Sequence, residues 1–164
     1  MDLYIIRHAW AGHFGDPAWP DDSKRPLTEK GKKRFGEFAA ALTRRGVEPT
    51  IIAASPMLRC RQTAEILATH LAHRAEVIQQ KELLPEGDFE SLLEWTSQQA
   101  RRHGQIAWVG HNPQVSEYVA ALIGLSEGSI YFSKGAVAAI RFAESLTPSA
   151  GELQWLITAE MLGL

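Results

Sequence analysis

The chain has 164 residues, of which 45% are hydrophobic and 22% are charged, and its formal net charge is −2. This length suits one domain over residues 1–164 with enough apolar side chains to fill a core. The nearly balanced charge gives no electrostatic reason to expect nucleic acid or an anionic membrane as a partner, and no apolar stretch is long enough to span a bilayer.

Cysteine usage and the first residues bear on the cellular compartment. Cys60 is the only cysteine, so the chain cannot form an internal disulfide, which suits a reducing environment. Residues 1–3 carry no basic region or cleavable apolar segment of the kind that begins a secretory signal. These features predict a soluble, cytoplasmic protein.

Strand-like and helix-like patterns alternate along the chain. The apolar run at residues 2–7 predicts a buried strand, which a loop containing Gly, Pro, Asp and Trp follows. Thr28 is a suitable cap for an amphipathic helix that ends near Gly46, and residues 50–54 predict the next strand. The apolar stripe of that helix consists of Phe35, Phe38, Ala39 and Leu42.

The second half of the chain continues this alternation. Ser55 and Pro56 have the pattern of a helix cap followed by proline at the first helical position. Further elements are expected as a strand at 76–79, a helix at 89–102, a strand at 105–109, a helix at 112–123, and strands at 136–142 and 152–158. The last two strands are expected to pair antiparallel at an edge. The whole pattern predicts a three-layer α/β/α fold with a mostly parallel, mixed sheet.

Polar residues follow three of the predicted strands. Arg7 ends the first strand and His8 comes next, Ser55 and Arg59 follow the second, and His111 follows the strand at 105–109. Because parallel strands end at the same edge of a sheet, where open α/β sheets bind ligands, we expect these residues to converge. Arginine binds phosphate oxygens with two donors at once, and a neutral imidazole can attack phosphorus. The convergence predicts a phosphoryl-binding site.

These motifs resemble the histidine phosphatase superfamily, whose fold is called phosphoglycerate mutase-like. The matching stretches are Arg7-His8-Ala9, Ser55 to Ala64, and Gly110-His111-Asn112. The short chain, Arg25-Pro26-Leu27-Thr28 and the His-Asn-Pro sequence are most similar to the SixA-type phosphohistidine phosphatases. The resemblance implies that His8 becomes phosphorylated, that Arg7 and Arg59 hold the phosphoryl oxygens, that His111 completes the pocket, and that Arg25 is a further phosphate contact.

Catalysis by His8 sets two physical requirements. One ring nitrogen needs a free lone pair, so we expect a backbone carbonyl to hold the proton on the other nitrogen. The arginines, together with a cationic or hydrogen-bond-donating His111, would offset the charge of the phosphoryl oxygens. We therefore expect neither a metal ion nor another cofactor.

The leaving group distinguishes the substrate classes. Ester phosphatases of this superfamily protonate an alkoxide with a carboxylic acid from the segment after the third strand, here residues 82–88. Glu86 and Asp88 are candidate proton donors, with turn or capping roles as the alternative. The spacing resembles the phosphohistidine subgroup, in which this acid is absent. An imidazole protonated on its remote nitrogen leaves as a neutral molecule and needs little help, so a missing acid favours a phosphoramidate substrate.

Three functions remain open at this point. The first is metal-independent hydrolysis of phosphohistidine on a signalling protein. The second is a small-molecule phosphatase for sugar phosphates or nucleotides, which an essential Glu86 or Asp88 would favour. The third is a non-catalytic module that binds phosphate or a phosphoprotein, and the intact His8 and His111 argue against it.

Overall fold

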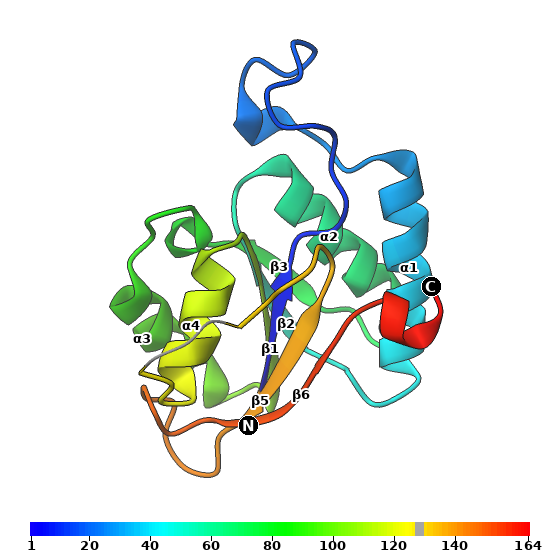
Figure 1. The fold of residues 1–164 in the computed structure, drawn as a ribbon. Helices are drawn as coiled ribbons and strands as arrows, with labels where there is room; N and C mark the ends of the chain where they lie inside the picture. Colours follow the sequence, from blue (N-terminus) through cyan, green and yellow to red (C-terminus); the bar gives the residue numbers. More distant parts are fainter. Residues whose placement is uncertain (127–129) are drawn as a thin grey trace.

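A computed structural model of the chain describes residues 1–126 and 130–164. In this part of the chain, six strands form one sheet in the order β3-β2-β4-β1-β5-β6 (Figure 1). The strands are β1 (Asp2–Arg7), β2 (Ile51–Ala54), β3 (Glu76–Gln79), β4 (Gln105–Gly110), β5 (Val137–Arg141) and β6 (Glu152–Ile157). Strands β1 to β4 run parallel, whereas β5 is antiparallel to both β1 and β6. The predicted mixed, mostly parallel sheet is confirmed.

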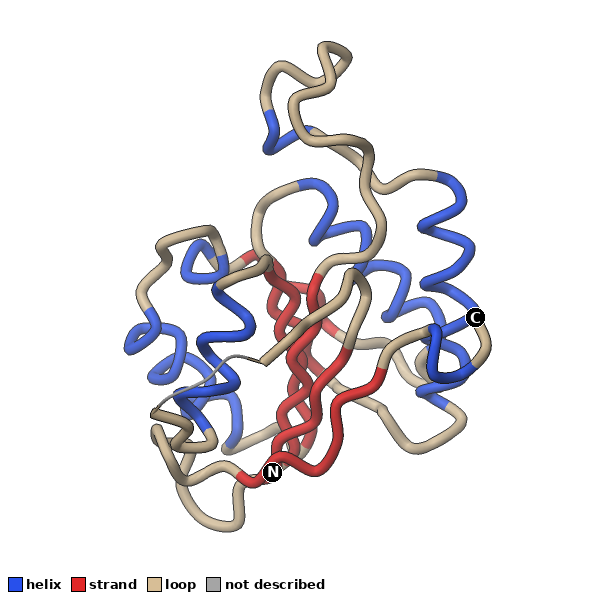
Figure 2. The backbone as a smooth tube through the Cα atoms, viewed as in Figure 1, coloured by secondary structure: helices blue, strands red, loops and turns tan. Residues whose placement is uncertain are grey.

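Helices cover both faces of this sheet (Figure 2). The helices are α1 (Glu29–Thr43) and α2 (Leu58–His70) on one face, and α3 (Phe89–Ala100) and α4 (Gln114–Leu122) on the other. In β1, Tyr4 and Ile6 belong to the core beneath α1 and α2, whereas Leu3 and Ile5 belong to the core beneath α3 and α4. Successive side chains of a strand point to opposite faces, so an uninterrupted apolar strand serves both cores. No helix of the described residues is long and apolar enough to cross a membrane.

Local capping rules predict the start of α1 but not that of α2. Thr28 caps α1 through its Oγ1, which accepts a hydrogen bond of 2.9 Å from the backbone of the first turn. Helix α2 begins at Leu58 rather than at Pro56, and Ser55 does not cap it. The buried Ser55 hydroxyl instead lies 2.9 Å from Nε2 of His111. A contact between two strand ends thus overrides the capping preference of Ser55.

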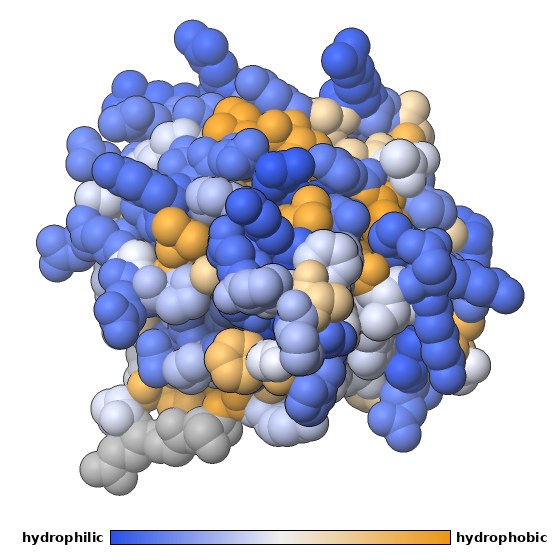
Figure 3. Space-filling model, turned by 90° about the horizontal axis from the view of Figure 1, so that it is seen from above, coloured by the Kyte–Doolittle hydropathy of each residue, from blue (hydrophilic) through white to orange (hydrophobic). Residues whose placement is uncertain are grey.

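A long loop leads from the carboxyl end of β1 to α1, and it projects beyond the sheet in dark blue at the top of Figure 1. It contains one 3₁₀ turn, η1 (Asp22–Lys24), and a bridge between Ala11 and Leu27 closes its base. Figure 3 views the molecule from this side, where mostly hydrophilic residues cover the surface and hydrophobic residues form small separate groups. The polar edge of the sheet therefore lies under a polar surface.

Candidate active site

The carboxyl ends of β1, β2 and β4 bring the predicted site residues together. His8 directly follows β1, His111 directly follows β4, and Arg59 lies in the first turn of α2. The rings of His8 and His111 have centroids 5.3 Å apart. The exposed fractions of His8, Arg59 and His111 are only 7%, 5% and 4%. The structure therefore places two imidazoles and a guanidinium in one buried group.

His8 is held through its backbone and through its ring. Its N–H donates to the carbonyl of Gly110 at 3.0 Å, and its carbonyl accepts from the N–H of Gly135 at 3.1 Å. Gly135 has a φ of 74°, which other residues rarely adopt. The His8 Nδ1 lies 2.7 Å from the carbonyl oxygen of Ala9. Because a carbonyl only accepts, Nδ1 carries the proton and Nε2 keeps the lone pair that a nucleophile needs.

Burial keeps both imidazoles neutral. It lowers the pKa of His8 to about 3, outweighing the hydrogen bond to Ala9, and the nearby His111, Arg59 and Arg7 lower this pKa further. Burial also lowers the pKa of His111 to about 4, with repulsion by Arg59 as the next cause. Burial therefore favours the neutral ring of His111 near pH 7 over the cationic form.

This neutrality predicts an unusual pH dependence of kcat/KM. A histidine with the ordinary pKa of about 6.5 would lose its nucleophilic form below that pH. Because the pKa of His8 is lowered, its neutral form persists as the pH falls, and the loss due to His8 should lie below about pH 5. The measurement is kcat/KM for para-nitrophenyl phosphate against pH, corrected for substrate ionisation, with circular dichroism to verify folding. A half-loss from the enzyme near pH 6.5 would contradict the lowered pKa.

Arg59 and Arg25 share one carboxylate, that of Asp22. Its Oδ2 lies 3.0 Å from Nη2 of Arg59 and its Oδ1 lies 2.7 Å from Nε of Arg25. Burial raises the pKa of Asp22, but the hydrogen bond from Arg25 and the charges of both arginines outweigh it, and the net pKa is below the ordinary value. Asp22 is therefore ionised and orients both guanidinium groups. Asp22 belongs to none of the sequence motifs, and its position three residues before Arg25 was the available signal.

Two guanidinium donors near His8 have no acceptor in the part of the chain that the structure describes. Nη1 of Arg7 donates to the carbonyl of Phe132 at 2.7 Å. The Nε atoms of Arg7 and Arg59 are buried and have no hydrogen-bond partner among the described residues. A buried donor without an acceptor costs about 1–3 kcal/mol, so both would be stabilised by an anion. The charges of both arginines act on the His8 ring, which places this demand for an anion beside the nucleophile.

Two surface hollows include the histidines. The first, here called the phosphoryl hollow, measures about 440 Å³ and is lined by His8. The second, here called the acidic hollow, measures about 340 Å³ and is lined by His111, Glu86 and Glu117. The remaining residues of the phosphoryl hollow are Arg7, Ala11, Gly12, His13, Phe14, Arg25 and Lys134. Arg25 thus lines the same hollow as His8, and Glu86 lines the same hollow as His111. Lys134, which lies outside the sequence motifs, also lines the phosphoryl hollow.

The structure does not bring Asp88 to the site. Its carboxylate caps α3, where it accepts hydrogen bonds from the hydroxyl of Ser91 and, at 3.1 Å, from the N–H of Glu90. The hydrogen bond from Ser91 is the main cause that lowers the pKa of this exposed carboxyl. Asp88 is therefore ionised near pH 7 and has no proton to donate. Its capping alternative is the correct one, which leaves Glu86 as the candidate acid.

Ser55 and Cys60 contact the other side of the site. The hydroxyl of Ser55 and the sulfur of Cys60 lie 2.9 Å and 3.3 Å from Nε2 of His111. Burial raises the pKa of the Cys60 thiol to about 12. The thiol therefore stays protonated and packs beneath His111 rather than acting as a nucleophile.

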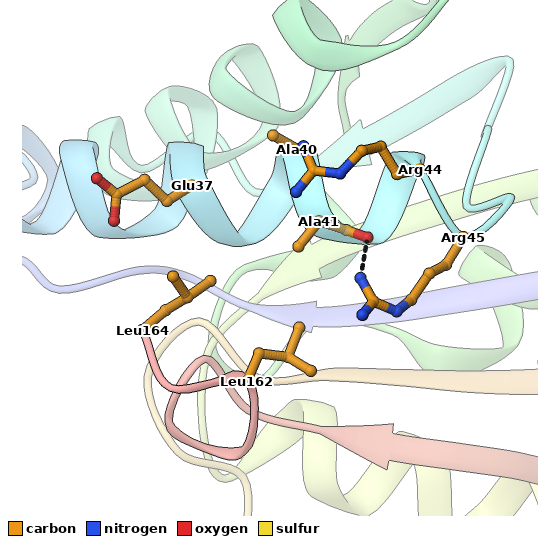
Figure 4. Close-up of a pocket in the computed structure, with 7 residues that line it drawn as sticks. All are labelled: Glu37, Ala40, Ala41, Arg44, Arg45, Leu162 and Leu164. Carbon is orange, nitrogen blue, oxygen red and sulfur yellow. Dashed lines mark hydrogen bonds between the residues drawn. The ribbon is translucent and has the colours of Figure 1, made fainter.

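A further hollow of about 440 Å³ lies between α1 and the turn η3 (Glu160–Leu162). Figure 4 shows Leu162 and Leu164 beside α1, and Arg45 donates to the carbonyl of Ala41 at 2.9 Å. None of the predicted site residues lines this hollow. The size of a hollow is therefore not what identifies the site in this molecule.

Comparison with known proteins agrees with this geometry. The sequence profile of the histidine phosphatase superfamily (branch 1) matches residues 3–120. The chain is 38% identical over 124 residues, which are 74% of its length and 73% of the relative's, to an uncharacterized protein of Picosynechococcus sp.. It is 27% identical to the protein histidine phosphatase SixA solved with tungstate, over 99% of both chains and with a TM-score of 0.85. An alpha-ribazole phosphatase of Shigella flexneri shares the fold, with 16% identity over 97% of both chains and a TM-score of 0.68.

Proposed function

Because the chain belongs to the histidine phosphatase superfamily, which implies phosphatase activity, we propose that it removes phosphate from phosphohistidine on a protein through phosphorylation of His8. The observation that carries this proposal is the environment of the His8 ring. The ring is neutral, a carbonyl holds its Nδ1 proton, and near it lie two buried arginine donors that have no acceptor among the described residues. The similarity to SixA over nearly the whole chain supports the substrate class.

The proposed reaction has two displacements. Nε2 of His8 attacks phosphorus, and the bond from phosphorus to the substrate nitrogen breaks with its electron pair returning to that nitrogen. Arg7, Arg25 and Arg59 offset the charge on the oxygens of the phosphoryl group. Water then attacks phosphorylated His8, which gives inorganic phosphate and restores the free imidazole. In this proposal residues 1–164 form a single catalytic domain.

The surface around the phosphoryl hollow supports a protein substrate. Phe14 lines this hollow and is 73% exposed. A hollow with such an exposed rim can admit a phosphorylated side chain carried by another protein. A cytoplasmic role in signal transduction belongs to this proposal, and the single buried thiol of Cys60 is compatible with it.

A small-molecule phosphatase is the second candidate, and the position of Glu86 favours it. Glu86 lines the acidic hollow together with His111, where a carboxylic acid could protonate an alkoxide. Esters need such an acid because an alkoxide is a poor leaving group. In this alternative Glu86 is essential and the substrate is a sugar phosphate or a nucleotide.

We expect fast phosphate release from a phosphohistidine protein in the presence of EDTA, because the arginines supply the positive charge that a metal would otherwise supply. A sugar phosphate is assayed alongside, and each substrate is tested with the wild type and Glu86→Gln. Glu86→Gln should not abolish phosphohistidine hydrolysis, because the leaving imidazole needs no dedicated acid. Preferred ester hydrolysis that is lost in Glu86→Gln would establish the second candidate. Tight phosphate binding without turnover of either substrate would instead indicate a binding module.

A further inference from the structure

The acidic hollow is the part of the site that the proposed phosphoryl chemistry does not use. It shares His111 with the site, it carries the exposed carboxylates of Glu86 and Glu117, and no Lys or Arg is among the described residues that line it. The phosphoryl hollow, in contrast, is lined by two arginines and a lysine. The site therefore favours an anion on the side of His8 and a cation on the side of His111.

Gln114, which lines the acidic hollow, has a hydrogen-bond acceptor that the described residues leave unused. Its side chain lines the hollow and is only 5% exposed. Its Nε2 donates to the carbonyl of Leu84 at 2.6 Å and to the hydroxyl of Tyr118 at 2.7 Å, which sets the orientation of the amide. Its buried Oε1 accepts no hydrogen bond from the described residues. Buried amide oxygens usually accept a hydrogen bond, so Oε1 of Gln114 could accept one from an N–H group of a ligand.

We propose that the acidic hollow binds the imidazole ring of an N-phosphorylated histidine substrate while this ring is protonated and cationic. This inference rests on the proposed phosphatase function and names how the same site selects its substrate. The remote N–H of the imidazole would point to the carboxylates of Glu86 and Glu117 and to Oε1 of Gln114. Pro85, Pro113 and Tyr118 also line the hollow and offer apolar surface to the ring.

This placement assists the first displacement without a dedicated acid. The two carboxylates favour the protonated remote nitrogen. When the bond to phosphorus breaks, the electron pair stays on the leaving nitrogen, the remote proton stays in place, and imidazole departs neutral. A leaving group with its own carboxylate or phosphate would be repelled from the same hollow. The two hollows together therefore select a phosphoryl group attached to a cation.

The test is substrate selectivity in variants of Glu117, an exposed residue of α4. The probes are a short phosphohistidine peptide without acidic residues and para-nitrophenyl phosphate, whose leaving group carries no cation. Glu117→Gln should lower kcat/KM for the peptide about threefold to tenfold, and Glu117→Lys should lower it further. Hydrolysis of para-nitrophenyl phosphate should not fall. Glu94→Gln, which removes the same charge from an exposed position on α3 outside the hollow, should change neither substrate.

The outcomes separate this inference from the proposed function. Unchanged kcat/KM values for both probes in Glu117→Gln reject the imidazole subsite and leave the proposed phosphatase function intact. An equal loss of both activities in a folded Glu117→Gln protein also rejects it. A wild type that hydrolyses neither probe rejects the proposed function and the inference together. Glu117→Gln nearly preserves side-chain size, so the test does not depend on the folding of Glu117→Lys.

Discussion

Replacing His8 with alanine should lower the rate of phosphate release by about 10⁴-fold or more, because it removes the nucleophile that splits the reaction into two displacements. In the wild type, rapid quenching should trap phosphate on the protein in an acid-labile form typical of a phosphorylated imidazole. His8→Ala should trap none. The measurements are steady-state phosphate release and the amount of phosphorylated protein.

The control for this prediction is a second histidine in the same hollow. His13 also lines the phosphoryl hollow and is exposed, so His13→Ala should retain turnover and the trapped phosphate. Because Arg7, Arg25 and Arg59 stay in place, His8→Ala should still bind tungstate. Acid-labile phosphate on His8→Ala would show that another residue is the nucleophile.

Removing Arg59 should have the second largest effect, a loss of about 10²–10³-fold in kcat/KM. Its buried Nε has no acceptor within residues 1–126 and 130–164, while its Nη atoms bind Asp22. Arg59→Ala would remove the donor available to the phosphoryl oxygens and would leave the Asp22 carboxylate with one partner fewer. Arg59→Lys should recover only part of the loss, because an ammonium keeps the charge without the planar pair of donors.

The double-mutant cycle with Asp22→Asn separates binding from positioning. If Asp22 orients Arg59, the two substitutions should be clearly non-additive in kcat/KM. Arg61→Ala is the matched control, since Arg61 lies two residues further along α2 and lines neither hollow. The inhibition constant of tungstate is measured for each variant. An unchanged constant in Arg59→Ala would mean that Arg59 serves only to hold the loop at Asp22.

The choice between Glu86 and Asp88 illustrates what sequence patterns leave open. Both carboxylates lie in the segment after β3 and have the same chemistry in the sequence. The structure uses Asp88 as the cap of α3 and places Glu86, at a φ of 65°, on the hollow that His111 also lines. Which carboxylate faces the site depends on the path of the loop, and residue type does not determine that path.

Ser55 shows how a local rule can fail at a site. Its sequence context favours a helix cap, and the structure instead directs its hydroxyl to His111, a residue 56 positions later. Local preferences of this kind amount to about 1 kcal/mol, so one buried hydrogen bond between strand ends can outweigh them. Sequence distance hides such partners until the sheet order is known.

The sequence by itself determined the alternation of strands and helices, the mixed sheet, and the meeting of Arg7, His8, Arg59 and His111. Apolar periodicity is a short-range property, and parallel strands must end at a common edge. Only the tertiary structure decided the neutral state of the imidazoles, the sharing of Asp22 by two arginines, and the opposite charges of the two hollows. These properties depend on burial and on distances between residues far apart in the chain, and electrostatic energies follow those distances rather than the order of the residues.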